Sequence, residues 1–434
     1  MPAGTPSGTV DAGVRQAATL AGPKPPREPM TTTRVKQRAI QLFGPAFVAA
    51  VAYVDPGNVA ANVSAGARYG YLLLWVLVLA NAMSVLVQYL SAKLGLATGR
   101  SLPECLADRL PRPGRYAYFV QAEVIAIATD LAEVVGGAIA LNLLFGLPLV
   151  WGGVITGVVS LGVLHVQSKR GQRSFELVVT GMLVIITIGF VSGLFFSPVS
   201  AGEMMSGLVP RFAGTDSVLL AASMLGATVM PHAVYLHSSL TRDRHGPVTD
   251  PQEMHRLVRA TRWDVVCALV VAGSVNIAML VLAAANLRGV EGTDSIEGAQ
   301  AAIAQAMGTG MGVVFAVGLL FSGLASTSVG AYAGVEVLHG LLHVRPPILL
   351  VRLITLVPAL VVLLLGAAPT SALVISQVVL SLGIPFALIP LVWLTGRRSL
   401  MGTQANHPVT AGLAWLTTGL IVALNVALIA LTLA

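Results

Sequence analysis

The chain has 434 residues, of which 55% are hydrophobic and only 10% are charged, and its mean hydropathy is +0.81. These values exclude an ordinary soluble domain and predict an all-α polytopic membrane protein that lies in a lipid bilayer. The formal net charge of +7 does not require nucleic acid as a partner, because the topology predicted below accounts for it.

In chain order, residues 1–37 come first; they are rich in Pro, Gly, Thr and Ala and lack the apolar core of a signal peptide. We expect them to form a disordered cytoplasmic tail. Apolar runs of the length that crosses a hydrocarbon core of about 30 Å follow, and they predict about 11 transmembrane helices. These runs lie near 39–65, 70–96, 116–145, 147–165, 174–196, 217–240, 262–286, 311–340, 347–367, 370–395 and 409–433.

The positions of Lys and Arg predict the orientation, because short cytoplasmic loops retain positive charge. If the N-terminus is cytoplasmic, every Lys and Arg except Arg68, Arg211 and Arg288 lies in or next to a cytoplasmic segment. The longest loop on that side, residues 241–261, is expected to be a solvated surface loop. We therefore predict a multi-pass protein of the cell (plasma or inner) membrane, with its C-terminus outside.

Two of the predicted spans contain a proline among polar residues, at residues 55–58 (Asp-Pro-Gly-Asn) and 230–232 (Met-Pro-His). Proline breaks or kinks a helix, and unwound backbone at membrane depth is tolerated where it lines a cavity or is covered by protein. The broken spans are the first and the sixth, so they are five spans apart. Because five is an odd number, a second copy of a five-span unit would enter the membrane from the opposite side. This pattern predicts two inverted five-helix repeats, residues 38–196 and 217–395, with helix 11 at 409–433 outside them.

The residues at the two breaks have the chemistry of metal ligands. Asp55 offers a carboxylate, Asn58 an amide oxygen, and Ala52 a carbonyl freed by the break; these hard donors also suit Mg²⁺ or Ca²⁺. Met230 adds a soft thioether and Ala227 a freed carbonyl, and the thioether favours transition ions such as Mn²⁺ and Fe²⁺, or Cd²⁺. The breaks therefore predict a site for a divalent transition-metal ion.

Met230 and Asp55 each have an alternative interpretation, and so does the site as a whole. Met230 could be a gap-filling core methionine, and Asp55 could simply cap the half-helix that follows it. A transporter of an amino acid or organic cation would use Asp55 to pair with an amine, and a non-transporting membrane metal sensor would need no flux. The sequence has no HExxH, Walker A or CxxC motif, so we expect neither an enzyme nor a bound cofactor.

The third span contains Glu123, Asp130 and Glu133, which fall on one stripe of a helix. Ionisable groups inside a membrane are typical of proton relays. Alternatively the stripe pairs with a cation across a helix interface, with Glu123 and Arg352 as the candidate pair. We assign His232 to the proton pathway and not to the direct ligands of the metal.

The two proline motifs resemble those of the Nramp family of proton-coupled divalent-metal transporters, whose bacterial members are the MntH manganese importers. The resemblance runs from about residue 38 to the end of the chain. It implies a LeuT-like fold and import of Mn²⁺ or Fe²⁺, with H⁺, by alternating access. It further implies that Gln377 joins the metal ligands in some states, and that the acidic residues of the third span, His232 and Arg352 take part in proton movement.

Overall fold

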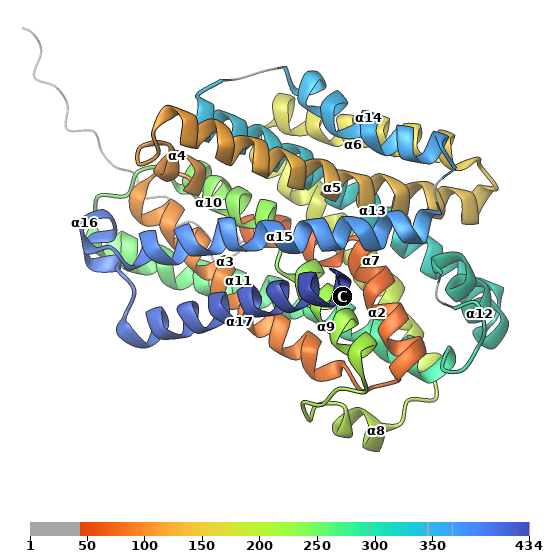
Figure 1. Ribbon diagram of the computed structural model, residues 1–434. Helices are drawn as coiled ribbons and strands as arrows, with labels where there is room; N and C mark the ends of the chain where they lie inside the picture. Colours follow the sequence, from red (N-terminus) through yellow and green to blue (C-terminus); the bar gives the residue numbers. More distant parts are fainter. Residues whose placement is uncertain (1–43, 294, 345–346, 367, 434) are drawn as a thin grey trace, which may run out of the picture. The chain divides into compact units, whose positions relative to one another are not determined.

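The computed structural model describes residues 44–433 apart from 294, 345–346 and 367 (Figure 1). The predicted tail, residues 1–37, lies outside the described residues. Throughout the described part, every regular element is a helix. The unbroken membrane helices are α3 (Leu74–Thr98), α5 (Arg112–Phe145), α6 (Leu149–Arg170), α7 (Gln172–Ser192), α11 (Pro251–Asn286), α13 (Thr309–Leu342), α14 (Ile348–Leu364), α15 (Pro369–Gly396) and α17 (Pro408–Leu433).

The first and sixth predicted spans are broken at their prolines, as the sequence predicts. The first consists of α1 (Pro45–Val51), a short 3₁₀ turn η2 (Ala52–Val54) and α2 (Pro56–Tyr69), and the sixth of α9 (Thr215–Thr228) and α10 (Pro231–His245). Among the described residues, nine helical segments are long and apolar enough to cross a membrane, and two shorter apolar segments belong to the first and ninth spans. Together these segments correspond to the eleven predicted spans.

Four short helices at the ends of the bundle were not predicted: α4 (Leu102–Ala107), α8 (Ala201–Ser206), α12 (Ile296–Met307) and α16 (Arg398–Met401). The prediction of a surface loop over 241–261 is wrong for most of its length. α10 continues to His245, and α11 begins at Pro251, where the Asp250 side chain accepts a hydrogen bond from the backbone N–H of Gln252 (3.0 Å). This cap and a proline in the first turn start a helix well before its apolar part begins.

The backbone at each break is extended for one residue before the proline. Asp55 has φ −68° and ψ 166°, and Met230 has φ −84° and ψ 125°. These values lie in the region that a residue before proline prefers, so the following half-helix can start only at the proline itself. Each break therefore leaves backbone carbonyls without their usual helical donors.

The two broken helices cross near the centre of the bundle in opposite directions. α1 packs against α10, and α2 packs against α9; Figure 1 shows α2 beside α9. Since the first half of one helix contacts the second half of the other, the pair is antiparallel, as the inverted repeats require. α11, α5 and α13 enclose this pair, and Gly136 of α5 lies so close to the ring of Pro56 that a β-carbon there would overlap it.

Polar side chains from neighbouring helices satisfy two of the freed carbonyls of the first break. Asn276 of α11 donates from Nδ2 to the carbonyl oxygen of Tyr53 (2.8 Å), and Ser322 of α13 donates from Oγ to that of Val54 (2.5 Å). Buried carbonyls need such partners, because no water is available to replace a helical donor. These two bonds therefore hold the unwound segment in place beside the candidate site.

Candidate metal-binding site

All six predicted metal ligands are buried in the region of the two breaks or on the adjacent helix α15. They are Ala52, Asp55, Asn58, Ala227, Met230 and Gln377, and each is at most 2% exposed. Ala52 begins the 3₁₀ turn η2 of the first break, and Met230 is the extended residue before Pro231 at the second break. The structure joins Asp55, Asn58, Ala227 and Gln377 by direct polar contacts.

An amide N–H group lies between two of the predicted oxygen ligands. Asn58 donates from Nδ2 to the Asp55 carboxylate oxygen Oδ1 (2.6 Å) and to the backbone carbonyl of Ala227 (2.9 Å). Gln377 approaches the other carboxylate oxygen of Asp55 with its Nε2 at 3.5 Å. Both oxygens of a fully buried carboxylate are thus approached by the partly positive end of an amide.

A divalent ion bound between these oxygens would take the place of the two amide N–H groups. An Asn or Gln amide carries an oxygen opposite its nitrogen, so rotation of each amide would present an acceptor to the ion. Gln377 can approach this closely only because residue 57 is glycine: a β-carbon at Gly57 would overlap the Gln377 amide. No signal in the sequence alone singled out Gly57 for this role.

Asp55 also caps α2, which was the alternative interpretation of this residue. Its Oδ1 accepts a hydrogen bond from the backbone N–H of Asn58 (2.8 Å). A carboxylate has two oxygens and about four acceptor sites, so capping does not use up its capacity to bind a cation. Capping instead fixes the direction in which the carboxylate points.

The donor set is of mixed character. Nowhere in residues 44–433, apart from the four positions left undescribed, do three or more His, Cys, Asp or Glu side chains gather in a way that could hold a metal ion. A permanent zinc-type centre would use such a cluster. A single carboxylate with amide and carbonyl oxygens suits an ion that must also be released.

The acidic stripe of α5 is largely buried, but its ion pair differs from the predicted one. Arg352 of α14 pairs with Asp130 and not with Glu123. Glu123 lies seven residues earlier, about 10 Å along the helix at 1.5 Å per residue, whereas Val351 and Thr355 of α14 line a cavity together with Asp130. The predicted pair of Glu123 with Arg352 is therefore wrong.

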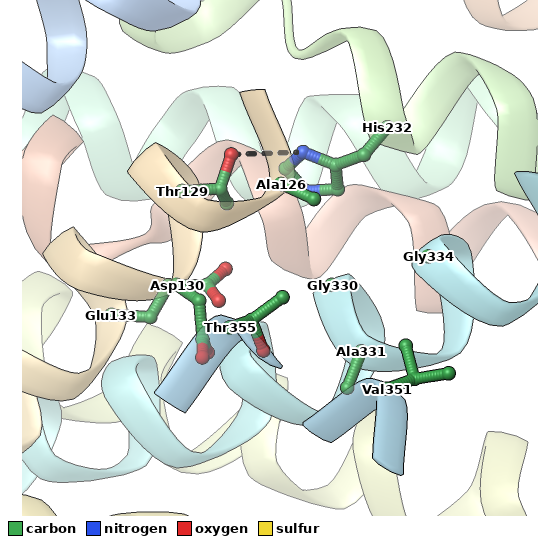
Figure 2. A pocket seen from close by; sticks show the side chains of 10 residues that line it. All are labelled: Ala126, Thr129, Asp130, Glu133, His232, Gly330, Ala331, Gly334, Val351 and Thr355. Atoms are coloured by element: carbon green, nitrogen blue, oxygen red, sulfur yellow. Dashed lines mark hydrogen bonds between the residues drawn. The ribbon is translucent and has the colours of Figure 1, made fainter. Parts of the chain in front are cut away.

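Figure 2 shows the cavity next to this ion pair, with the carboxylates of Asp130 and Glu133 on one side and the His232 ring on the other. It has room for about one water molecule (about 10 Å³). His232 contacts the Thr129 hydroxyl through Nδ1 (3.5 Å), while its Nε2, both carboxylate oxygens of Glu133 and Oδ1 of Asp130 have no hydrogen-bond partner among the described residues. Such a lining is what a bridging water requires.

A second cavity of similar size adjoins the first at His232. It is also lined by Gln121, Glu123 and Tyr235, and the two cavities share Ala126, His232 and Gly334. His232 thus lies between the carboxylates of Asp130 and Glu133 in the first cavity and that of Glu123 in the second. The structure therefore brings the five predicted proton-pathway residues together, as one ion pair and two adjoining cavities.

Comparison with known proteins gives a consistent result. The family model described as natural resistance-associated macrophage protein-like (Nramp) matches residues 46–431. The divalent metal cation transporter MntH of Mycobacterium tuberculosis is 60% identical over 391 residues, which are 90% of this chain and 91% of that protein. MntH of Bacillus subtilis is 45% identical over 395 residues, covering 90% and 92% of the two chains.

Solved structures extend the comparison to the fold. The crystal structure of the Eremococcus coleocola manganese transporter matches with a TM-score of 0.82 and 30% identity, and covers 92% of this chain and 87% of that one. A nucleobase-cation-symport-1 family transporter matches with a TM-score of 0.55 at 16% identity, which shows the LeuT-like fold alone. With the paired helix breaks and a family match over nearly the whole described chain, the protein belongs to the Nramp family.

Proposed function

We propose that this chain is a divalent metal cation transporter that imports Mn²⁺ or Fe²⁺, and also accepts Cd²⁺, together with protons by alternating access. The observation that carries the proposal is the contact of Asp55, Asn58 and Ala227 across two antiparallel helix breaks. The names of the relatives, divalent metal cation transporter and manganese transporter, support the coarse function. Their family consists of transporters, so an enzymatic activity is not expected.

Alternating access is supported by the burial of the candidate ligands. None of the six is more than 2% exposed, so an ion can reach or leave them only when the surrounding helices move. The broken helices lie against α3, α5, α11, α13 and α15, and a relative movement of these groups would open the site first to one side and then to the other. An inside-negative potential of about 100 mV would add about 4.6 kcal/mol for a doubly charged ion.

Proton coupling is supported by the two cavities beside the site. A carboxylate must be deprotonated to bind a metal ion, so binding at Asp55 releases any proton held there. Glu133 and His232 line the same small cavity, and Glu123 lines the next. Neither cavity is lined by a predicted metal ligand, so a proton that passes from Asp55 to Glu133 would follow a route that the metal ion itself does not use.

Selectivity for transition ions is assigned to the Met230 thioether. The oxygens of Asp55, Asn58 and Ala227 would bind Mg²⁺ and Ca²⁺ as well, whereas a thioether contributes little to binding hard cations. Met230 is fully buried at the second break. Met279 of α11 is a buried methionine outside both breaks and therefore serves as a matched control.

The test uses purified full-length protein in liposomes that contain a metal-sensitive dye and a pH-sensitive dye. We expect Mn²⁺, Fe²⁺ and Cd²⁺ to enter together with acidification of the lumen, and Asp55→Asn to abolish metal entry. Met230→Ala should admit Ca²⁺ or Mg²⁺ while keeping part of the Mn²⁺ flux, and Met279→Ala should keep wild-type selectivity.

Each rival function predicts a different result in the same assay. A metal sensor would show no metal flux with Asp55 intact, and an amino acid or organic cation transporter would respond to an amine and not to Mn²⁺. Metal entry without acidification would contradict proton coupling alone. Selectivity unchanged in Met230→Ala would contradict the role of the thioether.

A further inference from the structure

One aromatic side chain at the end of α15 is contacted by two arginines from distant parts of the chain. The Cζ atom of Arg397 lies 3.7 Å from the centre of the Trp393 ring, and that of Arg109, which follows α4, lies 6.0 Å from it. Both distances end at the same ring, so the two guanidinium groups are within about 10 Å of each other. Figure 1 shows α4 and α16 at the same end of the bundle.

Neither arginine has an acidic partner within the described part of the chain. Arg109 donates from Nη1 to the backbone carbonyl of Cys105 (2.7 Å), which leaves its other N–H groups available. The neighbouring carboxylate, Asp108, pairs with Arg100, and this hydrogen bond lowers the pKa of Asp108 below its ordinary value; the charge of Arg109 lowers it further without a direct ion pair. Both cations therefore contact the same aromatic ring, and neither forms a salt bridge with an acidic side chain of the described residues.

Other arginines of the bundle, unlike Arg109 and Arg397, form salt bridges with glutamates. Arg242 pairs with Glu104 and Glu336, and Arg244 pairs with Glu176. Two exposed like charges within about 10 Å of each other repel only weakly in water, and an anion bound to both of them would replace this repulsion by attraction. The planar donors of two guanidinium groups match the oxygens of a phosphate.

The position of Trp393 along its helix places this pair at the surface of the bilayer. Trp393 lies three residues before the end of the membrane-spanning segment Ile375–Gly396, where indole rings are enriched at the membrane interface. It is 39% exposed and continues an exposed apolar stripe of α15 formed by Leu382, Phe386 and Ile389. These residues follow each other at spacings of three and four, so they lie on one face of the helix.

We propose that Arg109, Arg397 and Trp393 form a binding site for the phosphate headgroup of an anionic phospholipid. The acyl chains of the lipid lie along the exposed stripe of α15, and the phosphodiester accepts hydrogen bonds from both guanidinium groups. Because Arg109 precedes α5 and Arg397 follows α15, the headgroup joins a helix of the first repeat to a helix of the second. The predicted orientation places the site on the cytoplasmic side, where loops are basic.

The test is lipid binding by purified full-length protein, measured by native mass spectrometry during titration with phosphatidylglycerol or phosphatidylcholine. We expect tight retention of phosphatidylglycerol and weak retention of phosphatidylcholine. The double variant Arg109→Gln/Arg397→Gln should lose about 10- to 30-fold in affinity for phosphatidylglycerol, since each basic group near a membrane surface contributes a factor of about five. Thermal unfolding without added lipid shows whether the variant is folded.

A matched control removes two exposed cations elsewhere at the membrane surface. Lys169 and Arg170 end α6 and are exposed. Because neither is among the cations that contact an aromatic ring in the described residues, Lys169→Gln/Arg170→Gln should reduce phosphatidylglycerol binding clearly less than Arg109→Gln/Arg397→Gln. An equal loss in this control, or equal binding of both lipids by the wild-type protein, would overturn the proposal. Binding of soluble glycerol phosphate as tight as that of phosphatidylglycerol would show a site for free phosphate and would also overturn it.

Discussion

Separating Asp130 from Arg352 should destabilise the protein strongly, because both side chains are buried. The side chain of Arg352 is 0% exposed and that of Asp130 6%. Replacing one partner leaves the other charge in the core without compensation, which typically costs about 3 to 5 kcal/mol. We therefore expect Asp130→Asn and Arg352→Gln each to lower the free energy of unfolding by that amount. The double variant should lose less than the sum of the two, with a coupling of about 2 kcal/mol or more.

The free energy of unfolding is measured by reversible unfolding of the purified protein in detergent, for the wild type, both single variants and the double variant. The four values form a double-mutant cycle that gives the coupling energy of the pair. A matched cycle on Arg288 and Glu203 provides the control, because that pair is exposed, at 61% and 57%, and exposed pairs contribute about 0 to 1 kcal/mol. A coupling of the buried pair no larger than that of the exposed pair would contradict this expectation. A buried pair that could be split without cost would mean that water reaches it freely.

Two further predictions concern the residues that hold the metal site in shape. Gly57→Ala should reduce Mn²⁺ uptake about 10-fold or more, because the methyl group would overlap the Gln377 amide, whereas Gly162→Ala, which has no neighbouring atom within 4 Å, should transport normally. Wild-type uptake by Gly57→Ala would show that this contact is not needed. Asn276→Ala should lower the free energy of unfolding by about 1 to 3 kcal/mol, because it leaves the buried Tyr53 carbonyl unpaired; an unchanged unfolding curve would contradict that assignment.

The fold was predictable to a large extent because the bilayer limits what a chain can do. A run of about 20 apolar residues is a membrane helix whatever its neighbours are, and a proline ends a helix by local geometry. The spans and both breaks could therefore be assigned from the sequence. The loop over 241–261 was assigned incorrectly, since a polar extension of a membrane helix has no hydropathy signal and depends on the cap at Asp250.

The candidate site was predictable as a set of residues but not as an arrangement. Asp55 and Met230 stood out because polar or soft groups beside a proline are unusual in an apolar run. The partner of Arg352 could not be inferred, because Glu123 and Asp130 lie on the same stripe of α5 and only the level at which α14 crosses that helix distinguishes them.

By itself the sequence determined where the chain crosses the membrane, where two of those crossings break, and which side chains at the breaks can bind a metal ion. Only the tertiary structure decided that Asn58 lies between Asp55 and Ala227, two residues from opposite repeats. It also decided that Arg109 and Arg397 meet at one tryptophan ring. The physical reason is that hydrophobicity and proline act locally along the chain, whereas contacts between distant residues depend on how the helices pack.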